Sequence, residues 1–161
     1  MNTEEQIWDF LEEVKDPEIP VLSVTDLGIV RNVEIGVNGL IVTITPTYTG
    51  CPATHIIEED IRSKLKEKGV SDFTIKTAIS PAWTTDWISA EGRKKLKIYG
   101  IAPPEESTPD KSLLSNKPKM VHCPRCHSIN TEMVSFFGST PCKALYTCKD
   151  CKEPFDYFKC L

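Results

Sequence analysis

Two pairs of cysteines with the spacing CxxC constrain the fold of this chain more than any other feature of its sequence. The first pair is Cys123 with Cys126, and the second is Cys148 with Cys151. Each tight CxxC turn directs two thiolates towards one point, so two such turns supply the four sulfur ligands of a tetrahedral zinc site. We predict a closed four-thiolate site with a structural Zn²⁺, because four protein ligands leave no coordination position for a substrate.

The same cysteines allow three other interpretations. They could be reduced thiols without a metal, they could form two disulfides, or they could hold iron as in rubredoxin. His122 and His127 flank the first pair, but four cysteines in register favour both histidines as bystanders. The acidic N-terminal segment lacks the features of a signal peptide, so we expect a cytoplasmic protein with reduced thiols. No apolar run approaches the roughly 20 residues that span a bilayer, so we expect no membrane segment.

The two CxxC pairs lie in a segment that is too short to build a stable core by itself. Residues 120–161 need an additional cross-link to fold stably, and a bound zinc ion would supply it. Residues 103–119 contain four prolines and show no periodicity, which is typical of a linker. We therefore expect a first domain over residues 1–102, a linker over 103–119 and a four-cysteine zinc ribbon over 120–161. Short ribbon strands are expected near 132–137, 143–148 and 154–159.

Residues 1–102 alternate between helical and strand periodicity. Apolar residues at helical spacing predict an amphipathic first helix, which Thr3 and Gln6 begin with a capping box. The Asn-Gly pair at 38–39 predicts a hairpin, and a later strand, helix, strand succession predicts a right-handed parallel crossover. Arg31 lies in the apolar phase of the first strand, which places the start of that strand at a sheet edge. The expected elements are helices at 3–15, at about 52–68 and from a Ser89 cap to about 98, and strands at 29–37, 40–45 and 73–79.

Three cysteines remain outside the CxxC pairs. Cys51 precedes Pro52 at the start of the second predicted helix, where unpaired amides and the helix dipole would lower the thiol pKa and raise its metal affinity. The alternative for Cys51 is a small apolar capping residue. His55 lies one helical turn further and could pair with Cys51, although a solvated histidine is commoner there. Cys142 and Cys160 are either inert core thiols or a second, more labile thiol site.

Several acidic and aromatic residues have both a functional and a structural interpretation. Asp16, Glu18 and Asp26 lie in the segment DPEIPVLSVTDLG and could reach a site. Their residue types favour helix caps and Asx-turns instead. Trp83 and Trp87 could form a binding surface, but packing is the more common role of such a pair.

The net charge of −4 divides unevenly along the chain. Residues 1–110 carry 11 Lys and Arg against 19 Asp and Glu, and residues 111–161 carry 8 against 4, so the charges are −8 and +4. The acidic part disfavours general nucleic-acid binding. The basic part leaves two alternatives, which are docking onto an acidic surface and a nucleic-acid-binding ribbon that uses Tyr157, Phe158 and Lys159.

Sequence motifs from both parts of the chain resemble those of a known family. DPEIP, VTDLG, TYTGCPA, SPAWTTDWIS and EGRKKLKIYGIAPP are similar to motifs of the SufT-like iron–sulfur cluster assembly factors. The ribbon segment CPRC…FGSTPCKALYTCKDCKEPFDYFKC extends the resemblance to residues from about 4 to 160. Over this range the chain resembles the D-subunit family of bacterial phenylacetyl-CoA epoxidases, which are also called phenylacetate-CoA oxygenases (PaaD or PaaJ).

The resemblance implies a fold of class α+β, with a small two-layer αββαβ domain followed by a C-terminal all-β zinc ribbon. It also implies an accessory, non-catalytic role in phenylacetate degradation, a branch of aromatic catabolism. In that system a di-iron oxygenase component epoxidises the ring and a flavin and iron–sulfur reductase supplies electrons. The PaaD-type protein would assemble or deliver iron or an iron–sulfur cluster for one of these two partners. The alternative is a scaffold or interaction subunit in which no thiol does chemistry.

The resemblance also assigns roles to individual residues. Cys51 in TGCP matches the family cysteine thought to hold iron or a cluster, and Asp16 and Glu18 match the DPE motif. The four CxxC cysteines match the ribbon ligands. One thiolate cannot hold a cluster, so Cys51 would share transiently bound iron or a cluster with a second copy in a homo-oligomer, or with a thiol of a partner.

Overall fold

The structure is a computed structural model that describes residues 1–48, 50–104, 121–140 and 142–158. The chain forms two compact units, Met1–Gly92 and Arg93–Leu161. This division comes earlier in the chain than residue 102, where the sequence predicts the end of the first domain. Most of the predicted linker, together with Lys159 and Cys160, lies outside the described residues. The predicted domain ranges therefore stay a prediction.

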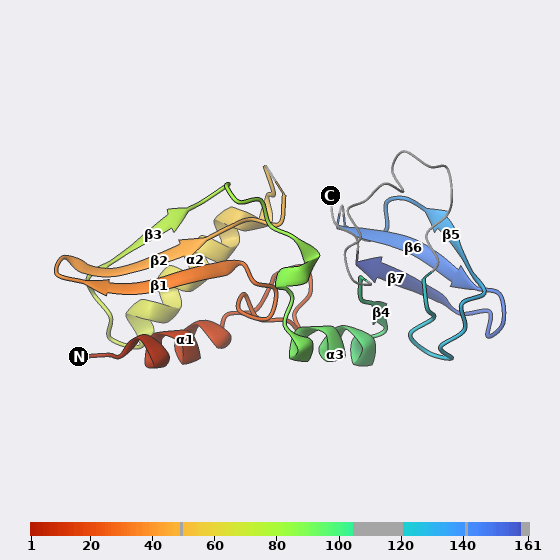
Figure 1. Cartoon of the computed structure of the whole chain (residues 1–161), viewed down its shortest axis with the longest axis horizontal. Helices are drawn as coiled ribbons and strands as arrows, with labels where there is room; N and C mark the ends of the chain where they lie inside the picture. Colours follow the sequence, from red (N-terminus) through yellow and green to blue (C-terminus); the bar gives the residue numbers. More distant parts are fainter. Residues whose placement is uncertain (49, 105–120, 141, 159–161) are drawn as a thin grey trace. The chain divides into compact units, whose positions relative to one another are not determined.

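The first unit is a small domain of helices packed on one sheet. Its main elements are α1 (Glu4–Glu12), β1 (Val30–Gly36), β2 (Gly39–Ile44), α2 (Ala53–Glu67) and β3 (Phe73–Thr77). β1 and β2 pair in antiparallel orientation, β2 and β3 are parallel, and the strand order is β1-β2-β3 (Figure 1). The order αββαβ and the parallel crossover through α2 confirm the predicted fold of this domain.

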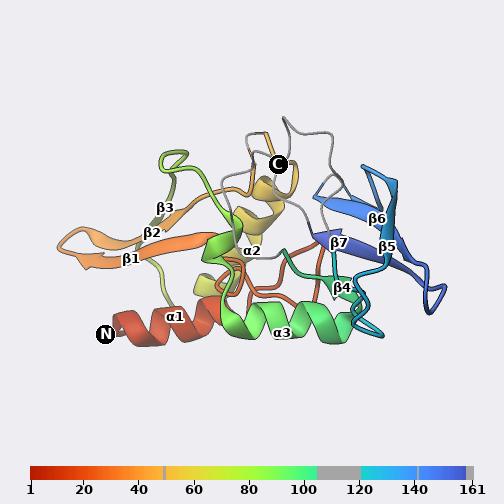
Figure 2. The ribbon, with the colours of Figure 1, turned by 45° about the vertical axis from the view of Figure 1, so that its right-hand side comes forward.

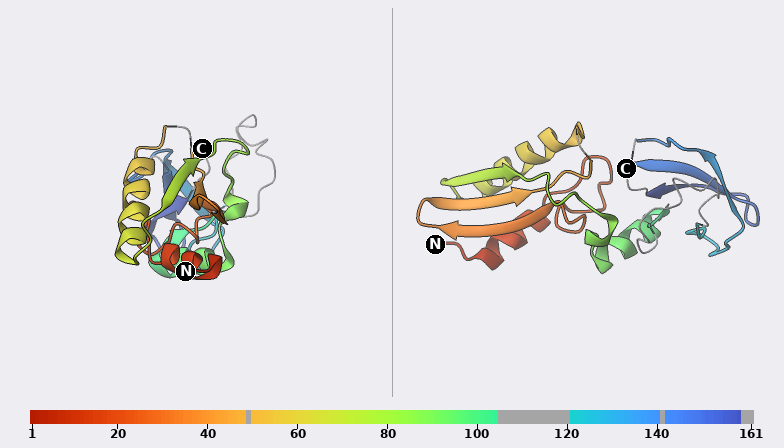
Figure 3. Two further views of the ribbon diagram at one scale, coloured as in Figure 1. Left: turned by 90° about the vertical axis from the view of Figure 1, so that its left-hand side faces the viewer. Right: turned by 45° about the horizontal axis from the view of Figure 1, so that its top comes forward.

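Both helices pack against the same face of this sheet (Figure 3) and bury their apolar residues there. α1 begins at the predicted capping box, in which Thr3 Oγ1 accepts from the Gln6 N–H at 3.3 Å and Gln6 Oε1 accepts from the Thr3 N–H at 3.0 Å. The alternating apolar residues of β2 face the helices, as the period of two requires. The buried residues of this layer are Ile7, Leu11, Leu40, Val42, Ile44, Ile57, Ile61 and Leu65.

β1 is an edge strand, as the position of Arg31 in its apolar phase predicts. A bulge between Val30 and Asn32 leaves Arg31 as the extra residue of the strand. The Arg31 guanidinium then lies 3.6 Å from the centroid of the Trp87 ring. The strand ends at Gly36 rather than at the predicted residue 37, because Val37 lies in the hairpin turn and is fully exposed.

A helical segment follows β3, and its last helix includes the division between the two units at residues 92 and 93. The 3₁₀ turn η1 (Thr85–Trp87) is followed by α3 (Ala90–Tyr99) (Figure 2). Ser89 Oγ accepts from the Gly92 N–H at 2.9 Å, which confirms the predicted cap of this helix. Within the described ranges, no helix combines the length and apolar character that crossing a membrane requires.

The second unit contains a four-stranded sheet. Its strands are β4 (Ile101–Ala102), β5 (Thr131–Ser135), β6 (Lys143–Cys148) and β7 (Pro154–Phe158), in the order β4-β7-β6-β5. The pairs β5–β6 and β6–β7 are antiparallel, which confirms the predicted all-β ribbon. β4 is parallel to β7, with Ile101 opposite Asp156. The sequence does not indicate this short strand, which lies within the range predicted for the first domain.

Candidate functional site

The four CxxC cysteines come together in the second unit. Cys123 and Cys126 lie in the loop before β5, Cys148 ends β6, and Cys151 lies in the turn between β6 and β7. Their Sγ atoms all lie within 4.8 Å of one another. Among the residues that the structure describes, no other group of three or more His, Cys, Asp or Glu side chains is close enough to hold a metal ion.

The sulfur positions fit a tetrahedral zinc ion. Zinc–sulfur bonds of about 2.3 Å place the sulfurs of a tetrahedron about 3.8 Å apart. The Sγ atoms of Cys123 and Cys151 are 3.8 Å apart, and those of Cys126 and Cys148 are 3.5 Å apart. All four are free cysteines rather than disulfides. The fold therefore assembles a four-cysteine metal site of the composition that the CxxC spacing predicts.

Each CxxC turn ends on a residue with a left-handed backbone. His127 follows Cys126 with a φ of 63°, and Lys152 follows Cys151 with a φ of 64°. The His127 N–H donates to the Cys123 carbonyl oxygen at 2.9 Å and so closes the first turn. The His127 side chain is exposed, and the group of close ligand atoms consists of the four cysteines.

The thiols of this site differ in acidity. The backbone N–H of Cys151 and, to a smaller extent, that of Asp150 lower the pKa of Cys148 to about 7 against the effect of burial. The Glu153 N–H acts in the same direction on Cys151, but burial and the neighbouring thiols raise the pKa of Cys151 to about 12. Near neutral pH the metal-free site therefore cannot hold four thiolates. Binding of a cation would release the remaining protons.

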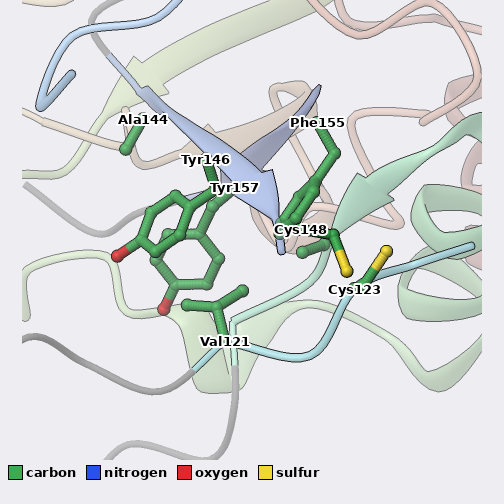
Figure 4. Packing of buried hydrophobic residues seen from close by; sticks show 8 residues of the cluster. Val121, Cys123, Ala144, Tyr146, Cys148, Phe155 and Tyr157 are labelled. Atoms are coloured by element: carbon green, nitrogen blue, oxygen red, sulfur yellow. The ribbon is translucent and has the colours of Figure 1, made fainter. Parts of the chain in front are cut away.

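Two of the ligand cysteines belong to the small core of the ribbon. Cys123 and Cys148 are buried, and their sulfur atoms point towards each other next to Phe155 (Figure 4). Tyr146 stacks on Phe155 with 5.8 Å between the ring centroids and meets Tyr157 edge to face at 5.6 Å. The other members of this cluster are Ala102, Val121 and Ala144. The metal site and the apolar core of the ribbon thus share residues.

The burial of the β7 aromatic residues bears on the nucleic-acid alternative. Tyr157 and Phe158 are only 5% and 2% exposed. A base needs an accessible ring face for stacking, and these two side chains do not offer one. Lys159 lies outside the described residues. The burial of Tyr157 and Phe158 therefore gives no support to the alternative of a nucleic-acid-binding ribbon.

Cys51 lies in the loop between β2 and α2, one residue before the N-cap residue Pro52. Its side chain is half-buried and forms no disulfide. Its backbone N–H donates to the Tyr48 carbonyl oxygen at 3.2 Å, and its carbonyl oxygen accepts from the Thr54 N–H at 3.1 Å. These backbone bonds fix the thiol beside the first turn of α2, as predicted. The neighbouring His55 is exposed.

The acidic residues after α1 serve the local backbone. Asp16 is buried, and its Oδ2 accepts from the Glu18 N–H at 2.9 Å and the Ile19 N–H at 2.8 Å. Asp26 accepts from the Ser23 N–H at 3.2 Å. These are the Asx-type contacts that the residue types favour. Within the described residues, Asp16, Glu18, His55 and Cys51 do not form a metal-holding group of three or more.

The remaining candidate residues mainly pack. Trp83 is buried and donates its Nε1–H to the Leu27 carbonyl oxygen at 2.8 Å. Trp87 is half-buried below the Arg31 guanidinium. Cys142 is buried, and its Sγ lies 3.1 Å from Thr140 Oγ1. These contacts agree with the structural interpretation of the tryptophans, whereas the role of Cys142 stays a prediction.

Comparison with known proteins identifies both parts of the chain. Residues 4–72 match the family described as iron-sulfur cluster assembly protein, and residues 107–159 match the PaaD zinc beta ribbon domain. The chain is 47% identical to an Escherichia coli K12 protein named as the putative D component of 1,2-phenylacetyl-CoA epoxidase, over 97% of this chain and 92% of that protein. The chain belongs to the PaaD family. A PaaD protein thus joins an iron–sulfur assembly domain to a zinc ribbon.

The N-terminal domain of this PaaD protein also has relatives that lack most of the ribbon. A Porphyromonas gingivalis "Fe-S protein maturation auxiliary factor" is 43% identical over 60% of this chain and 92% of its own length. Bacillus subtilis YitW, with the same description, is 34% identical over 58% of this chain and 93% of its own length. A Bacillus anthracis crystal structure of a "Domain of Unknown Function DUF59" covers 59% of the chain and 92% of its own, with a TM-score of 0.55 and 28% identity.

The PaaD ribbon contains one polar group that the cysteine spacing does not reveal. Ser128 and Asn130 follow the first CxxC pair, and Asp150 lies inside the second. The carboxylate of Asp150 accepts hydrogen bonds from both other side chains. The only sequence signal for this group is the occurrence of short polar residues at the two turns, where such residues are common.

Proposed function

We propose that this PaaD-family protein is a maturation factor that assembles or delivers iron or an iron–sulfur cluster to the oxygenase or the reductase of a phenylacetyl-CoA epoxidase. The observation that carries the proposal is Cys51, a half-exposed free thiol at the start of α2. It lies in a domain that matches iron–sulfur cluster assembly proteins and is 43% identical to a maturation auxiliary factor.

In this proposal Cys51 supplies one ligand to iron that is cargo. One thiolate cannot hold a cluster, so the other ligands come from a second copy of the chain or from the client protein. Incomplete coordination also makes the cargo easy to release to a site with more ligands.

We assign the ribbon a structural Zn²⁺ held by Cys123, Cys126, Cys148 and Cys151. The ion would supply the charge that lets all four thiols ionise and would cross-link the two CxxC turns. The four ligands complete its shell, so the cargo does not pass through this site. The partners of the whole protein are then the oxygenase and reductase subunits of the epoxidase.

The test replaces Cys51 with serine in the full chain and co-expresses it with the epoxidase subunits. We expect the purified complex to contain less iron and to lose most of its epoxidase activity, because the cargo loses its ligand. Cys142→Ser is the matched control, because it removes a thiol that is buried beside Thr140 and outside the ligand set. Full activity and iron content with Cys51→Ser would contradict the thiol's role and favour a scaffold function.

A further inference from the structure

The carboxylate of Asp150 connects the two CxxC turns of the ribbon through side-chain hydrogen bonds. Asp150, in the second turn, accepts from the Ser128 hydroxyl through Oδ2 and from Asn130 Nδ2 through Oδ1, the latter at 2.9 Å. The Asn130 N–H donates to Ser128 Oγ at 3.0 Å, and the Lys149 N–H donates to the Asn130 carbonyl oxygen at 2.9 Å. Both oxygens of Asp150 are thus engaged by the residues that follow the first turn.

The residues of this connection also contact the ligand sulfurs through their backbone. The Asp150 N–H donates to the Cys148 thiol, and the Ser128 N–H donates to the Cys126 thiol. The Sγ atoms of Cys126 and Cys148 are 3.5 Å apart. The side-chain bond between Ser128 and Asp150 therefore ties together the two backbone donors that hold one sulfur from each turn.

We infer that Asp150 is a positioning residue of the ribbon's metal site, which holds the two CxxC turns at the separation that Zn²⁺ requires. Hydrogen bonds that orient metal ligands commonly change metal affinity, because a ligand that must be moved into place binds more weakly. The bonds of Asp150 join segments that are 20 and 22 residues apart in sequence, and they tie Ser128 and Asn130 to the second turn, beside the backbone bond from Lys149 to Asn130. The inference rests on the structural zinc site proposed above.

Zinc affinity of the full-length chain tests this role. We expect Asp150→Ala to weaken apparent zinc affinity about 10- to 100-fold, measured by competition with a chromophoric chelator. Asp150→Asn keeps one oxygen acceptor and should lie between Asp150→Ala and the unchanged protein. Glu132→Ala is the matched control, because it removes another exposed ribbon carboxylate, which pairs with Lys149 at 3.4 Å, and it should leave the affinity within about twofold.

A double-mutant cycle separates positioning from a general loss of stability. Ser128→Ala should weaken zinc binding, and adding Asp150→Ala should cost less than the sum of the two single changes. The cobalt-substituted variants should also show altered d–d absorption bands, which report ligand geometry directly. Ser128→Ala and Asp150→Asn decide the case if Asp150→Ala does not fold.

Unchanged zinc affinity in Ser128→Ala and Asp150→Asn, or an equal loss in Glu132→Ala, would overturn the role of Asp150. Additive losses of zinc affinity in the Ser128→Ala and Asp150→Ala cycle would also overturn this role. Failure of the unchanged protein to bind zinc would instead overturn the structural zinc site itself. The two failures are therefore distinguishable.

Discussion

Gly28 occupies a position that no other residue type can take without displacing its surroundings. Its φ is +70°, in the left-handed region that residues with a Cβ rarely adopt. A Cβ at this position would lie 2.5 Å from the carbonyl oxygen of Trp87 and 2.6 Å from its Cβ. The loop before β1 therefore packs directly on η1 because Gly28 has no side chain.

We predict that Gly28→Ala lowers the free energy of unfolding of the first unit by roughly 2–4 kcal/mol, from backbone strain and overpacking together. The three tryptophans of the sequence, Trp8, Trp83 and Trp87, all lie in this unit. Urea titration followed by tryptophan fluorescence therefore measures its stability in the intact chain.

Gly69→Ala is the control for backbone strain alone. Gly69 has a φ of +82°, but no atom lies within 4 Å of its added Cβ. Gly69→Ala should lower the free energy of unfolding by only about 1 kcal/mol. Equal losses in Gly28→Ala and Gly69→Ala would show that the contact with Trp87 carries no energy.

The metal site shows how far single residues can be read from the sequence. Its four cysteines could be predicted because the CxxC spacing itself places two thiols together. Asp150 could not, because its partners Ser128 and Asn130 lie across the ribbon and only the folded chain brings them near. Arg31 is a second example. The sequence shows that Arg31 breaks the apolar pattern of its strand, but only the folded chain shows that it contacts Trp87.

The ends of α1 and α2 are joined by a small ionic cluster. Glu13, the C-cap residue of α1, is 2.8 Å from Lys68 Nζ through Oε1 and 3.2 Å from Lys64 Nζ through Oε2. Hydrogen bonds from Lys68 and then Lys64 lower the pKa of Glu13. A carboxylate with a lowered pKa stabilises the folded state above its ordinary pKa, and this contribution is lost as the pH falls through the lowered value.

We therefore predict that Glu13→Gln reduces the pH dependence of stability. The urea midpoint of the unchanged protein should fall between neutral pH and about pH 3, and this fall should be smaller in Glu13→Gln. Glu12→Gln removes the neighbouring charge of the same helix and serves as the control. A fall in Glu13→Gln as large as in the control would mean that the lysine pairs contribute nothing, as some exposed pairs do.

Element boundaries follow the sequence where local chemistry defines them. α1 begins at the Thr3 capping box, and α2 ends before Gly69, whose left-handed backbone stops it. β4 could not be predicted, because two apolar residues before a pair of prolines show no periodicity. β4 pairs with β7, a strand that lies more than 50 residues later in the sequence. The residues of β4 alone do not indicate this long-range pairing.

The two units of the molecule should respond differently to metal removal. The ribbon core is small and shares Cys123 and Cys148 with the metal site, whereas the first unit has its own helix-and-sheet core. We predict that a strong zinc chelator, or Cys148→Ser, unfolds the ribbon and leaves the first unit folded. The reason is that a segment of this size needs a bound ion to offset its chain entropy.

Two-dimensional amide NMR of the intact protein measures this outcome. Signals of β5–β7 should collapse to unfolded positions on chelation, while those of α1 and α2 stay in place. Adding Zn²⁺ back should restore the ribbon signals of the chelated protein but not those of Cys148→Ser. A ribbon spectrum unaffected by both treatments would contradict the structural role of the metal.

The pairing of β4 with β7 has a consequence for synthesis of the chain. Ile101 leaves the ribosome 55 residues before its partner Asp156. At 5–20 residues per second, this interval lasts about 3 to 11 s. The first unit precedes β4 completely and has this time to fold, whereas β4 must wait with two apolar residues unpaired. The order of translation therefore separates the folding of the first unit from the pairing of β4 with β7. The sheet of the ribbon is completed last.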